Sequence, residues 1–394
     1  MLYNFDEIID RQNTNSLKYD FASERGMPED LLPLWVADMD FRTPPAVINA
    51  LVDAAQHGIF GYSDVKDTYF HAVQNWLATR LNWHVEKDWL IKAPGVVFAI
   101  ANSVRALTGP DDAVIIQQPV YYPFESVVRD NGRHLAVNEL LYTDGQYRID
   151  FADFEAKIVA NRVKLFILCN PHNPVGRVWT RAELEQLGEI CLRHQVKVIA
   201  DEIHADFIYP GYRHEVFANL RPEFAAITVT CTAPSKTFNL AGLQVSNLFT
   251  TNREIKHAII HEIHRSGYSQ LNTLGLVACQ AAYENGADWL DELIAYLQGN
   301  LSVIREFLQE RLPEIRLIEP QGTYLAWLDC SGLGRSEAER QDLIVHQAKL
   351  WLDKGSMFGA GGTNFERINY ACPRKVLEQA LEQLERAVRG VREN

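Results

Sequence analysis

The sequence predicts an α/β protein whose central sheet is mainly parallel and flanked by helices, and two observations lead to that prediction. Short apolar runs rich in β-branched residues are typical of buried strands, and they occupy residues 113–119, 164–171, 197–202, 225–231 and 245–251. A longer helical pattern, "TRAELEQLGEICLRHQ", lies between two of these runs. It opens with a capping box from Thr180 to Glu183 and places Leu184, Leu187 and Cys191 on one helical face. Strands that alternate with helices favour a sheet covered by helices.

The pattern changes near residue 286, which predicts a second, smaller domain of α+β type. Long helical stretches there surround "GTYLAWLDC" and "FERINYACP". We therefore expect an N-terminal arm that is part of the small domain, residues 1–49, a large domain, residues 50–285, and a C-terminal small domain, residues 286–394. A chain of 394 residues is long enough for this division, because domains typically have roughly 150 residues.

The composition favours small-molecule chemistry in the cytoplasm. Lys and Arg total 38 against 51 Asp and Glu, a formal net charge of -13, so the sequence lacks the basic surface that nucleic-acid binding requires. The stretch "MLYNFDEIIDRQ" has no signal-peptide pattern, and no run approaches the roughly 18 apolar residues of a membrane span. Six scattered cysteines without a C-x-x-C pair are expected to be reduced core residues. We expect no nucleic-acid or membrane partner.

Three polar residues follow neighbouring predicted strands. Asn173 lies in "CNPHNPVG", Asp201 in "ADEIHADF" and Lys236 in "TAPSKTF". Because ligands bind outside the carboxyl ends of strands in such sheets, we expect these side chains to converge on one crevice. An amine, a carboxylate and an amide suit pyridoxal 5'-phosphate (PLP). The amine forms a Schiff base with the aldehyde, the carboxylate keeps the pyridine nitrogen protonated, and the amide bonds the ring oxygen.

Two further stretches supply the remaining parts of a PLP site. "APGVVFAIANSVRAL" has a Pro-Gly turn before a helical pattern, so the backbone N–H groups of Gly95, Val96 and Val97 are candidates to bind the phosphate. "QQPVYYPF" places Tyr121 and Tyr122 just after another strand, where an aromatic face would cover the cofactor ring. The sequence therefore predicts a complete PLP site.

Taken together, these stretches resemble a known family. "VADMDF", "PVYYPF", "NPHNPVGRVW", "DEIHADFIYPGY", "TAPSKTFNLAG" and "FERINYACP" are similar to PLP enzymes of aminotransferase fold type I, and within them to the cystalysin and cystathionine β-lyase group of C–S lyases. The likeness runs from about residue 3 to about residue 390, with all the motifs in order. It implies a large PLP-binding domain, a smaller α+β domain and a homodimer with shared active sites.

The resemblance also implies roles for individual residues. Lys236 becomes the Schiff-base lysine and the general base, Asp201 pairs with the pyridine nitrogen, and Asn173 bonds the ring oxygen. Tyr121 stacks on the ring, and Tyr122 beside it joins the catalytic set. These five positions form the predicted core of the site.

Other positions complete the predicted site. The resemblance implies that Arg367 holds the substrate carboxylate, and Ala37 of "VADMDF" is a second predicted substrate contact. It implies that Tyr62, in "FGYSD", reaches the cofactor phosphate of the partner subunit. Ser235 and the helix start at Gly95 are expected to bind the phosphate within the same chain.

Two positions depart from the wider superfamily. Gln244 stands eight residues after the lysine, where many relatives carry an arginine for the phosphate, and it can donate a hydrogen bond but has no charge. His204 stands three residues after the aspartate, where aminotransferases often have a tyrosine for the ring oxygen. We expect His204 to contact the cofactor, although its role is not defined by the sequence.

The sequence therefore predicts a PLP-dependent C–S β-lyase that cleaves cystathionine or a related cysteine thioether to a thiol, pyruvate and ammonia. Two alternatives stay open. An aminotransferase would use the same residues and return the proton to the cofactor carbon, and a regulatory protein would retain PLP with little turnover. No metal is expected, because the histidine-rich stretch "HAIIHEIHR" is not the H-E-x-x-H motif and no partner ligand is apparent.

Overall fold

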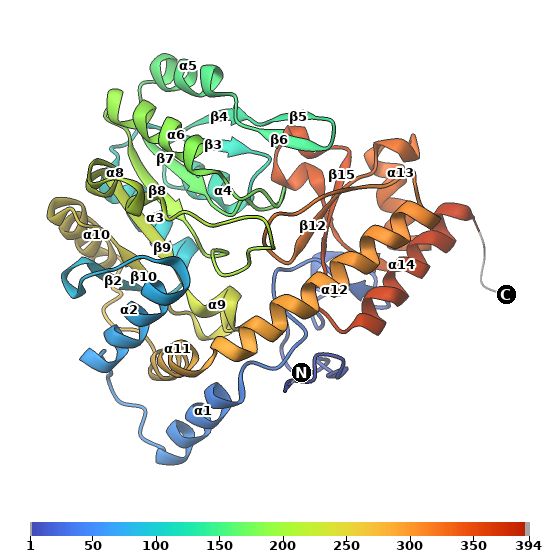
Figure 1. The fold of residues 1–394 in the computed structure, drawn as a ribbon, viewed down its shortest axis with the longest axis horizontal. Coiled ribbons are helices and arrows are strands. Elements are labelled where there is room, and N and C mark those ends of the chain that lie inside the picture. The colour runs from blue at the N-terminus through green and yellow to red at the C-terminus, as the bar shows by residue number, and fades with distance from the viewer. Residues whose placement is uncertain (1, 391–394) are drawn as a thin grey trace.

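The computed structural model describes residues 2–390, and a seven-stranded sheet lies at the centre of its larger part (Figure 1). The strand order is β2-β10-β9-β8-β7-β3-β4. Strands β9, β8, β7, β3 and β4 are parallel, whereas β10 runs antiparallel to both of its neighbours. The predicted α/β class is confirmed. The bounds are Leu90–Ala93 (β2), Ala113–Gln118 (β3), His134–Glu139 (β4), Val163–Cys169 (β7), Lys197–Asp201 (β8), Thr228–Thr232 (β9) and Ser246–Phe249 (β10).

Helices cover both faces of this sheet. The side chains of β3 alternate between the faces: Ile115 packs into one apolar cluster, and Val114 and Ile116 pack into another. The first cluster holds α5 (Phe151–Asn161), α6 (Arg181–Arg193), α7 (Phe217–Leu220) and α8 (Pro222–Ile227). The second holds α3 (Val96–Leu107), α4 (Pro123–Asp130) and α10 (Arg253–Arg265). A strand buried on both faces is mostly apolar, and β3 is buried along its whole length with four apolar residues at its start.

One predicted strand begins later than the sequence pattern indicates. The run 225–231 was expected to be extended, but its first three residues end helix α8, and β9 begins at Thr228. Pro222 stands at the start of α8, where its fixed backbone angle favours a helical turn. Phe224 is fully buried and stacks on Phe217 at 5.2 Å between ring centroids, so tertiary packing holds the turn together. The capping box predicted for Thr180 and Glu183 is present at the start of α6.

A second, antiparallel sheet is formed by the C-terminal part of the chain. Its strand order is β11-β12-β15-β14, and the bounds are Arg316–Ile318 (β11), Leu325–Asp329 (β12), Asp353–Lys354 (β14) and Phe365–Asn369 (β15). The accompanying helices are α12 (Ala287–Arg311), α13 (Glu337–Gln341) and α14 (Arg374–Arg389). The N-terminal arm joins this part through β1 (Leu32–Pro33), which pairs with β13 (Leu350–Trp351). The division at residues 49 and 285 stays a prediction.

The remaining elements lie around these two sheets. Helix α1 (Pro45–His57) extends away from the body of the chain beside α11 (Thr273–Asn285) and leads through a loop to α2 (Asp67–Leu81) (Figure 1). A hairpin of β5 (Leu141–Thr143) and β6 (Gln146–Arg148) lies near the second sheet. Helix α9 (Pro234–Thr237) is a single turn directly after β9.

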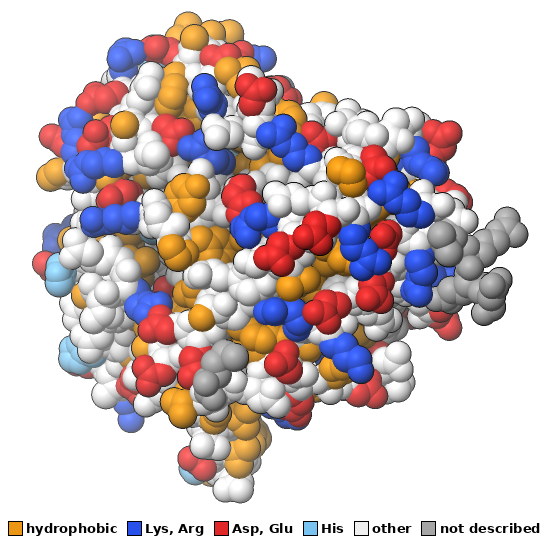
Figure 2. Space-filling view, turned by 45° about the vertical axis from the view of Figure 1, so that its right-hand side comes forward, with side chains coloured by type: hydrophobic (Ala, Val, Ile, Leu, Met, Phe, Trp, Pro, Cys, Tyr) orange, Lys and Arg blue, Asp and Glu red, His pale blue; other side chains and the backbone are white. Residues whose placement is uncertain are grey.

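The cysteines match the prediction, and the surface carries charges of both signs. Acidic and basic side chains are interspersed on the face that Figure 2 shows. All six cysteines are buried and free of disulfides, as predicted. None of the helices in the described part of the chain is long and apolar enough to cross a membrane.

Candidate active site

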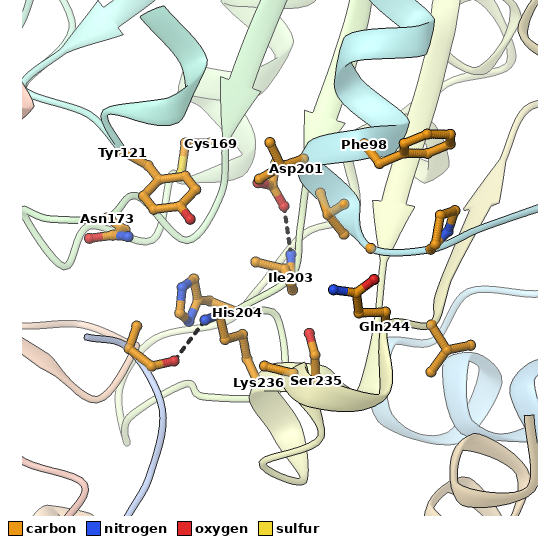
Figure 3. A pocket seen from close by; sticks show the side chains of 17 residues that line it. Phe98, Tyr121, Cys169, Asn173, Asp201, Ile203, His204, Ser235, Lys236 and Gln244 are labelled. Carbon is orange, nitrogen blue, oxygen red and sulfur yellow. Dashed lines mark hydrogen bonds between the residues drawn. The ribbon is translucent and has the colours of Figure 1, made fainter. Parts of the chain in front are cut away.

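The carboxyl ends of the parallel strands border a cavity of about 260 Å³ (Figure 3). Asp201 is the last residue of β8, and Cys169 is the last residue of β7. Lys236 lies in α9 after strand β9, Tyr121 follows β3, and Asn173 lies in the loop after β7. All five side chains line the cavity. The structure therefore brings together the amine, carboxylate, amide and phenol that the strand ends predicted.

Lys236 presents an amine that loses its proton more easily than an exposed lysine. Its Nζ donates a hydrogen bond to the backbone carbonyl of Ala37 at 2.7 Å. Burial lowers the pKa of Lys236 to about 8, and the charge of Asp38 acts in the opposite direction. A lysine with this pKa has a substantial fraction of nucleophilic free amine near neutral pH.

Asp201 is a buried carboxylate whose contacts leave it able to accept a cationic partner. Its Oδ1 accepts a hydrogen bond from the backbone N–H of Ile203 at 3.2 Å. Burial raises the pKa of Asp201 to about 7, although the charge of Lys236 lowers it. A protonated heteroaromatic nitrogen would satisfy this carboxylate, because an opposite charge inside a low-dielectric site stabilises the ionised form.

The side-chain amide of Asn173 has an orientation set by Arg367. Its Oδ1 accepts a hydrogen bond from Nη1 of Arg367 at 2.9 Å. The amide therefore keeps its Nδ2 group as a donor, and no acceptor for that group lies in the described part of the chain. A donor at this position fits an anionic ring oxygen, as the sequence predicted.

Arg367 lies behind Asn173 instead of in the cavity lining, and it is almost completely buried. Its Nη2 contacts the carboxylate of Asp353 and donates to the carbonyl of Trp35 at 3.0 Å. The guanidinium lies over the ring of Phe358 at 4.8 Å from the centroid. Its Nε has no hydrogen-bond partner in the described part of the chain. An anion such as a substrate carboxylate would satisfy this donor.

The start of helix α3 forms another side of the cavity. Gly95 precedes the helix with a positive φ of 96°, a conformation that favours glycine, and no side chain caps the helix there. The N–H of Gly95 donates to the carbonyl of Ala93 at 3.0 Å, so this glycine supplies the turn. The N–H groups of Val96 and Val97 at the first helical turn remain available for an anion.

Ser235 and Gln244 line the same cavity, and both carry neutral polar groups. Among the described residues that line it, Lys236 is the only lysine or arginine. An anion at the α3 end would therefore rely on neutral donors and on the helix dipole within this chain. The absence of an arginine at position 244 is thus not compensated by another arginine or by a second lysine in the lining.

Tyr122 and His204 differ in their relation to the cavity. The ring of Tyr122 lies 5.4 Å from that of Tyr121, but Tyr122 is 38% exposed and lies at the outer edge instead of in the lining. His204 lines the cavity and is buried, and its Nδ1 has no partner in the described part of the chain. Burial lowers the pKa of His204 well below its ordinary value, so the imidazole is neutral at neutral pH.

Tyr62 lies outside this cavity. It is 97% exposed and belongs to the loop between α1 and α2, where Ile59 and Phe60 are also more than half exposed. Within one chain it contacts none of the site described above, so its predicted role across a subunit interface stays a prediction.

The sequence did not identify several residues of the lining: Pro94, Phe98, Cys169, Ile203, Ala241 and Val245. Cys169 lies near the end of the predicted strand 164–171 and Ile203 follows Asp201 closely, so their places along the strands could have indicated them. Asp353 was also missed, because its pairing with Arg367 depends on the register between β14 and β15.

The large sheet has a lysine amine, a buried carboxylate and an uncapped helix start at its carboxyl edge. This combination is typical of lysine-dependent enzymes that hold a phosphorylated cofactor. Residues 29–384 match the family "Aminotransferase class I and II". The chain belongs to this family.

The similar proteins narrow the class further. The chain is 44% identical to cystathionine beta-lyase PatB of Bacillus subtilis over 385 residues, which cover 98% of this chain and 100% of PatB. The crystal structure of cystalysin from Treponema denticola, which contains a pyridoxal 5'-phosphate cofactor, has a TM-score of 0.96 and 37% identity and covers 100% of both chains. The PLP-bound C-S lyase of Staphylococcus hominis, complexed with L-cycloserine, has a TM-score of 0.92 and 33% identity and covers 99% of this chain and 100% of its own.

The lowered pKa of Lys236 predicts how its reactivity depends on pH. In the cofactor-free protein, we expect the acetylation rate of Lys236 to rise about tenfold per pH unit below pH 8 and to level off above it, because only the free amine reacts. The measurement is brief labelling with acetic anhydride followed by peptide mass spectrometry, with the exposed Lys164 and Lys375 as internal references. Asp38→Asn should move the midpoint to lower pH. A rate that still rises steeply near pH 10 would contradict the environment described.

Proposed function

We propose that this chain is a PLP-dependent C–S β-lyase that cleaves cystathionine or a related cysteine thioether to a thiol, pyruvate and ammonia. The observation that carries the proposal is the presence of the Lys236 amine, the buried Asp201 carboxylate and the Asn173 amide around one cavity, with Arg367 behind that amide. The names of the full-length relatives, a cystathionine beta-lyase and C-S lyases, favour β-elimination as the reaction.

The residues of the cavity fit PLP in their chemistry. Lys236 would hold the aldehyde carbon, Asp201 the pyridine nitrogen, and Asn173 Nδ2 the ring oxygen. The N–H groups of Val96 and Val97, together with Ser235 and Gln244, would bind the phosphate. Tyr121 and Ile203 offer apolar surfaces to the ring. When bound, PLP supplies an electron sink for the electron pair that the substrate Cα releases.

Three residues of the protein then act on different parts of the substrate. Arg367 binds the carboxylate and so orients the Cα–H bond. Lys236, once its amine is free, removes the Cα proton at Nζ, and its lowered pKa suits a general base near neutral pH. Burial raises the pKa of Tyr121, so its phenol stays protonated and can donate a hydrogen bond to the departing sulfur, while the proton held on Lys236 Nζ is available to protonate it. The unsaturated amino acid that remains takes up water and yields pyruvate and ammonia.

The experiment that tests the proposal follows thiol release from cystathionine by the PLP-loaded enzyme with no keto acid present. We expect steady release over many turnovers, because β-elimination needs no second substrate. An aminotransferase would release no thiol and would stop after consuming about one equivalent of substrate per site. Negligible reaction with every thioether would favour the PLP-retaining regulatory protein instead.

We also propose a homodimer in which each active site draws on both subunits, and a cytoplasmic location. Tyr62 supports the dimer, because a tyrosine that is 97% exposed among other exposed apolar residues fits a surface covered by a partner. The second chain would bring Tyr62 to the phosphate end of the cavity, where the lining of one chain offers only neutral donors besides Lys236 and His204.

Mixed dimers test the sharing of sites. Chains with Lys236→Ala and chains with Tyr62→Ala should each be impaired alone, and a mixture in equal amounts should recover up to about a quarter of the wild-type sites, since half of the dimers are hybrids with one intact site. Activity is measured after subunit exchange, and native mass spectrometry confirms that hybrids have formed. No recovery in the presence of hybrids would contradict shared sites.

A further inference from the structure

The N-terminal arm carries a cation that the proposed reaction does not use, close to the contacts of Arg367. Arg25 ends the short 3₁₀ turn Ser23–Arg25 of the N-terminal arm. Its guanidinium lies over the indole of Trp35, 5.0 Å from the ring centroid. That indole stacks on Trp351 with ring centroids 4.5 Å apart and an interplanar angle of 10°. Two stacked aromatic rings therefore support the charged group from beneath.

This aromatic pair is tied directly to the residue proposed to bind the substrate carboxylate. The carbonyl of Trp35 accepts a hydrogen bond from Nη2 of Arg367 at 3.0 Å. Trp351 precedes Asp353 by two residues, and Asp353 forms an ion pair with the same guanidinium. The position of Arg25 is thus linked through Trp35 to the position of Arg367.

Tyr122 connects the cation to the edge of the cavity. Its ring contacts that of Tyr121, which lines the cavity, and it is partly exposed. Burial is the main cause that raises the pKa of Tyr122, and the charge of Asp353 adds to the rise. The positive charges of Arg367 and Arg25 both act in the opposite direction on this phenol. The phenol of Tyr122 therefore lies within the electrostatic reach of both guanidinium groups.

Arg25 is also free to bind a ligand. It forms no ion pair with a carboxylate in the part of the chain that the structure describes, and its side chain makes no hydrogen bond there. The stacked rings beneath Arg25 already restrict its side chain. Binding a ligand therefore costs it less conformational entropy than it would cost an unsupported exposed arginine. Most other arginines in this structure are, by contrast, already paired with Asp or Glu.

We propose that Arg25 binds an anionic group at the far end of the leaving thiol, so that the enzyme prefers cysteine thioethers whose sulfur substituent carries a carboxylate. This inference rests on the proposed lyase function. In this proposal the amino-acid carboxylate binds Arg367, and a sulfur substituent that passes Tyr122 would bring its own charge to Arg25, which is held over Trp35. The cysteine half and the leaving half of the substrate are then each recognised by a guanidinium.

The test compares two substrates of similar shape that differ by one negative charge, S-(2-carboxyethyl)cysteine and S-propylcysteine. The readout is the ratio of their kcat/KM values, and thiol release measures both. We expect the wild-type enzyme to favour the charged substrate. Arg25→Met should lower the ratio by about two- to fivefold, mainly through KM of the charged substrate, and Arg25→Glu should lower it further. Added salt should lower the wild-type ratio in the same direction.

Arg253→Met is the matched control, because Arg253 is highly exposed on α10 and the change alters the net charge equally. This variant should leave the ratio unchanged. The inference would be overturned if both Arg25 variants kept the wild-type ratio, or if the wild-type enzyme showed no preference for the charged substrate. In either case, turnover of S-propylcysteine would still support the lyase function. Failure of the wild-type enzyme to cleave either substrate would instead overturn the proposed function.

Discussion

Lys236→Ala is expected to lower kcat for cystathionine by at least about 10³-fold, because loss of a positioned general base alone costs about 10²- to 10⁴-fold. Lys236 is also the proposed attachment point of the cofactor, and it is the one lysine among the described residues that line the cavity. The measurement is steady-state thiol release at saturating substrate and saturating PLP. Near-wild-type elimination in this variant would contradict the assignment of Lys236.

Two controls separate this role from a loss of folding. The amine of Lys236 is buried and its charged form is disfavoured, so the alanine variant should keep the thermal midpoint of the wild type. Added methylamine should restore part of the activity, with a dependence on the concentration of the free amine. Lys236→Arg should not be restored in this way, because the guanidinium fills the space and stays protonated.

Arg367→Lys is expected to lower kcat/KM by about 30-fold to several thousand-fold, since loss of a buried charge-assisted pair costs about 2 to 5 kcal/mol. The guanidinium contacts Asn173 and Asp353 through different nitrogens and keeps Nε for the substrate. An ammonium group has one nitrogen and cannot reproduce this geometry. Lysine is chosen because it keeps a positive charge beside the buried Asp353. The readout is the KM for amino-acid substrates.

Arg340→Lys provides a matched control for that prediction. Arg340 forms a fully buried ion pair with Glu366, the residue that precedes Arg367 in β15, but it does not line the cavity. Both substitutions disturb a buried pair in the same sheet, so a shared loss of stability would appear in both. If KM changes little in Arg367→Lys, or changes equally in the two variants, another residue holds the substrate carboxylate.

Much of the site could be predicted because its residues follow strands in a local pattern. Asn173, Asp201 and Lys236 each come after a buried apolar run, and parallel strands bring such positions to one edge. The start of β9 was misjudged because Pro222 and the packing of Phe224 make a helical turn from residues that favour a strand. Local propensity cannot show such tertiary packing.

The contacts around Arg367 could not be predicted in the same way. Trp35 and Asp353 are far from each other in the sequence. Trp35 belongs to the N-terminal arm, which pairs with β13 through β1, and Asp353 meets Arg367 through the pairing of β14 with β15. The orientation of the Asn173 amide depends on the same long-range contact. The exposure of Tyr62 likewise became visible only in three dimensions.

The most direct test of the central claim is the product balance from cystathionine with no keto acid added. Elimination at this cavity predicts homocysteine, pyruvate and ammonia in equal amounts, each far in excess of the enzyme, because every cycle returns Lys236 and the cofactor to their starting state. The opposite result is a single equivalent of substrate consumed per site, with its amino group retained on the cofactor and pyruvate absent until a keto acid is supplied. That outcome would contradict the lyase and establish an aminotransferase.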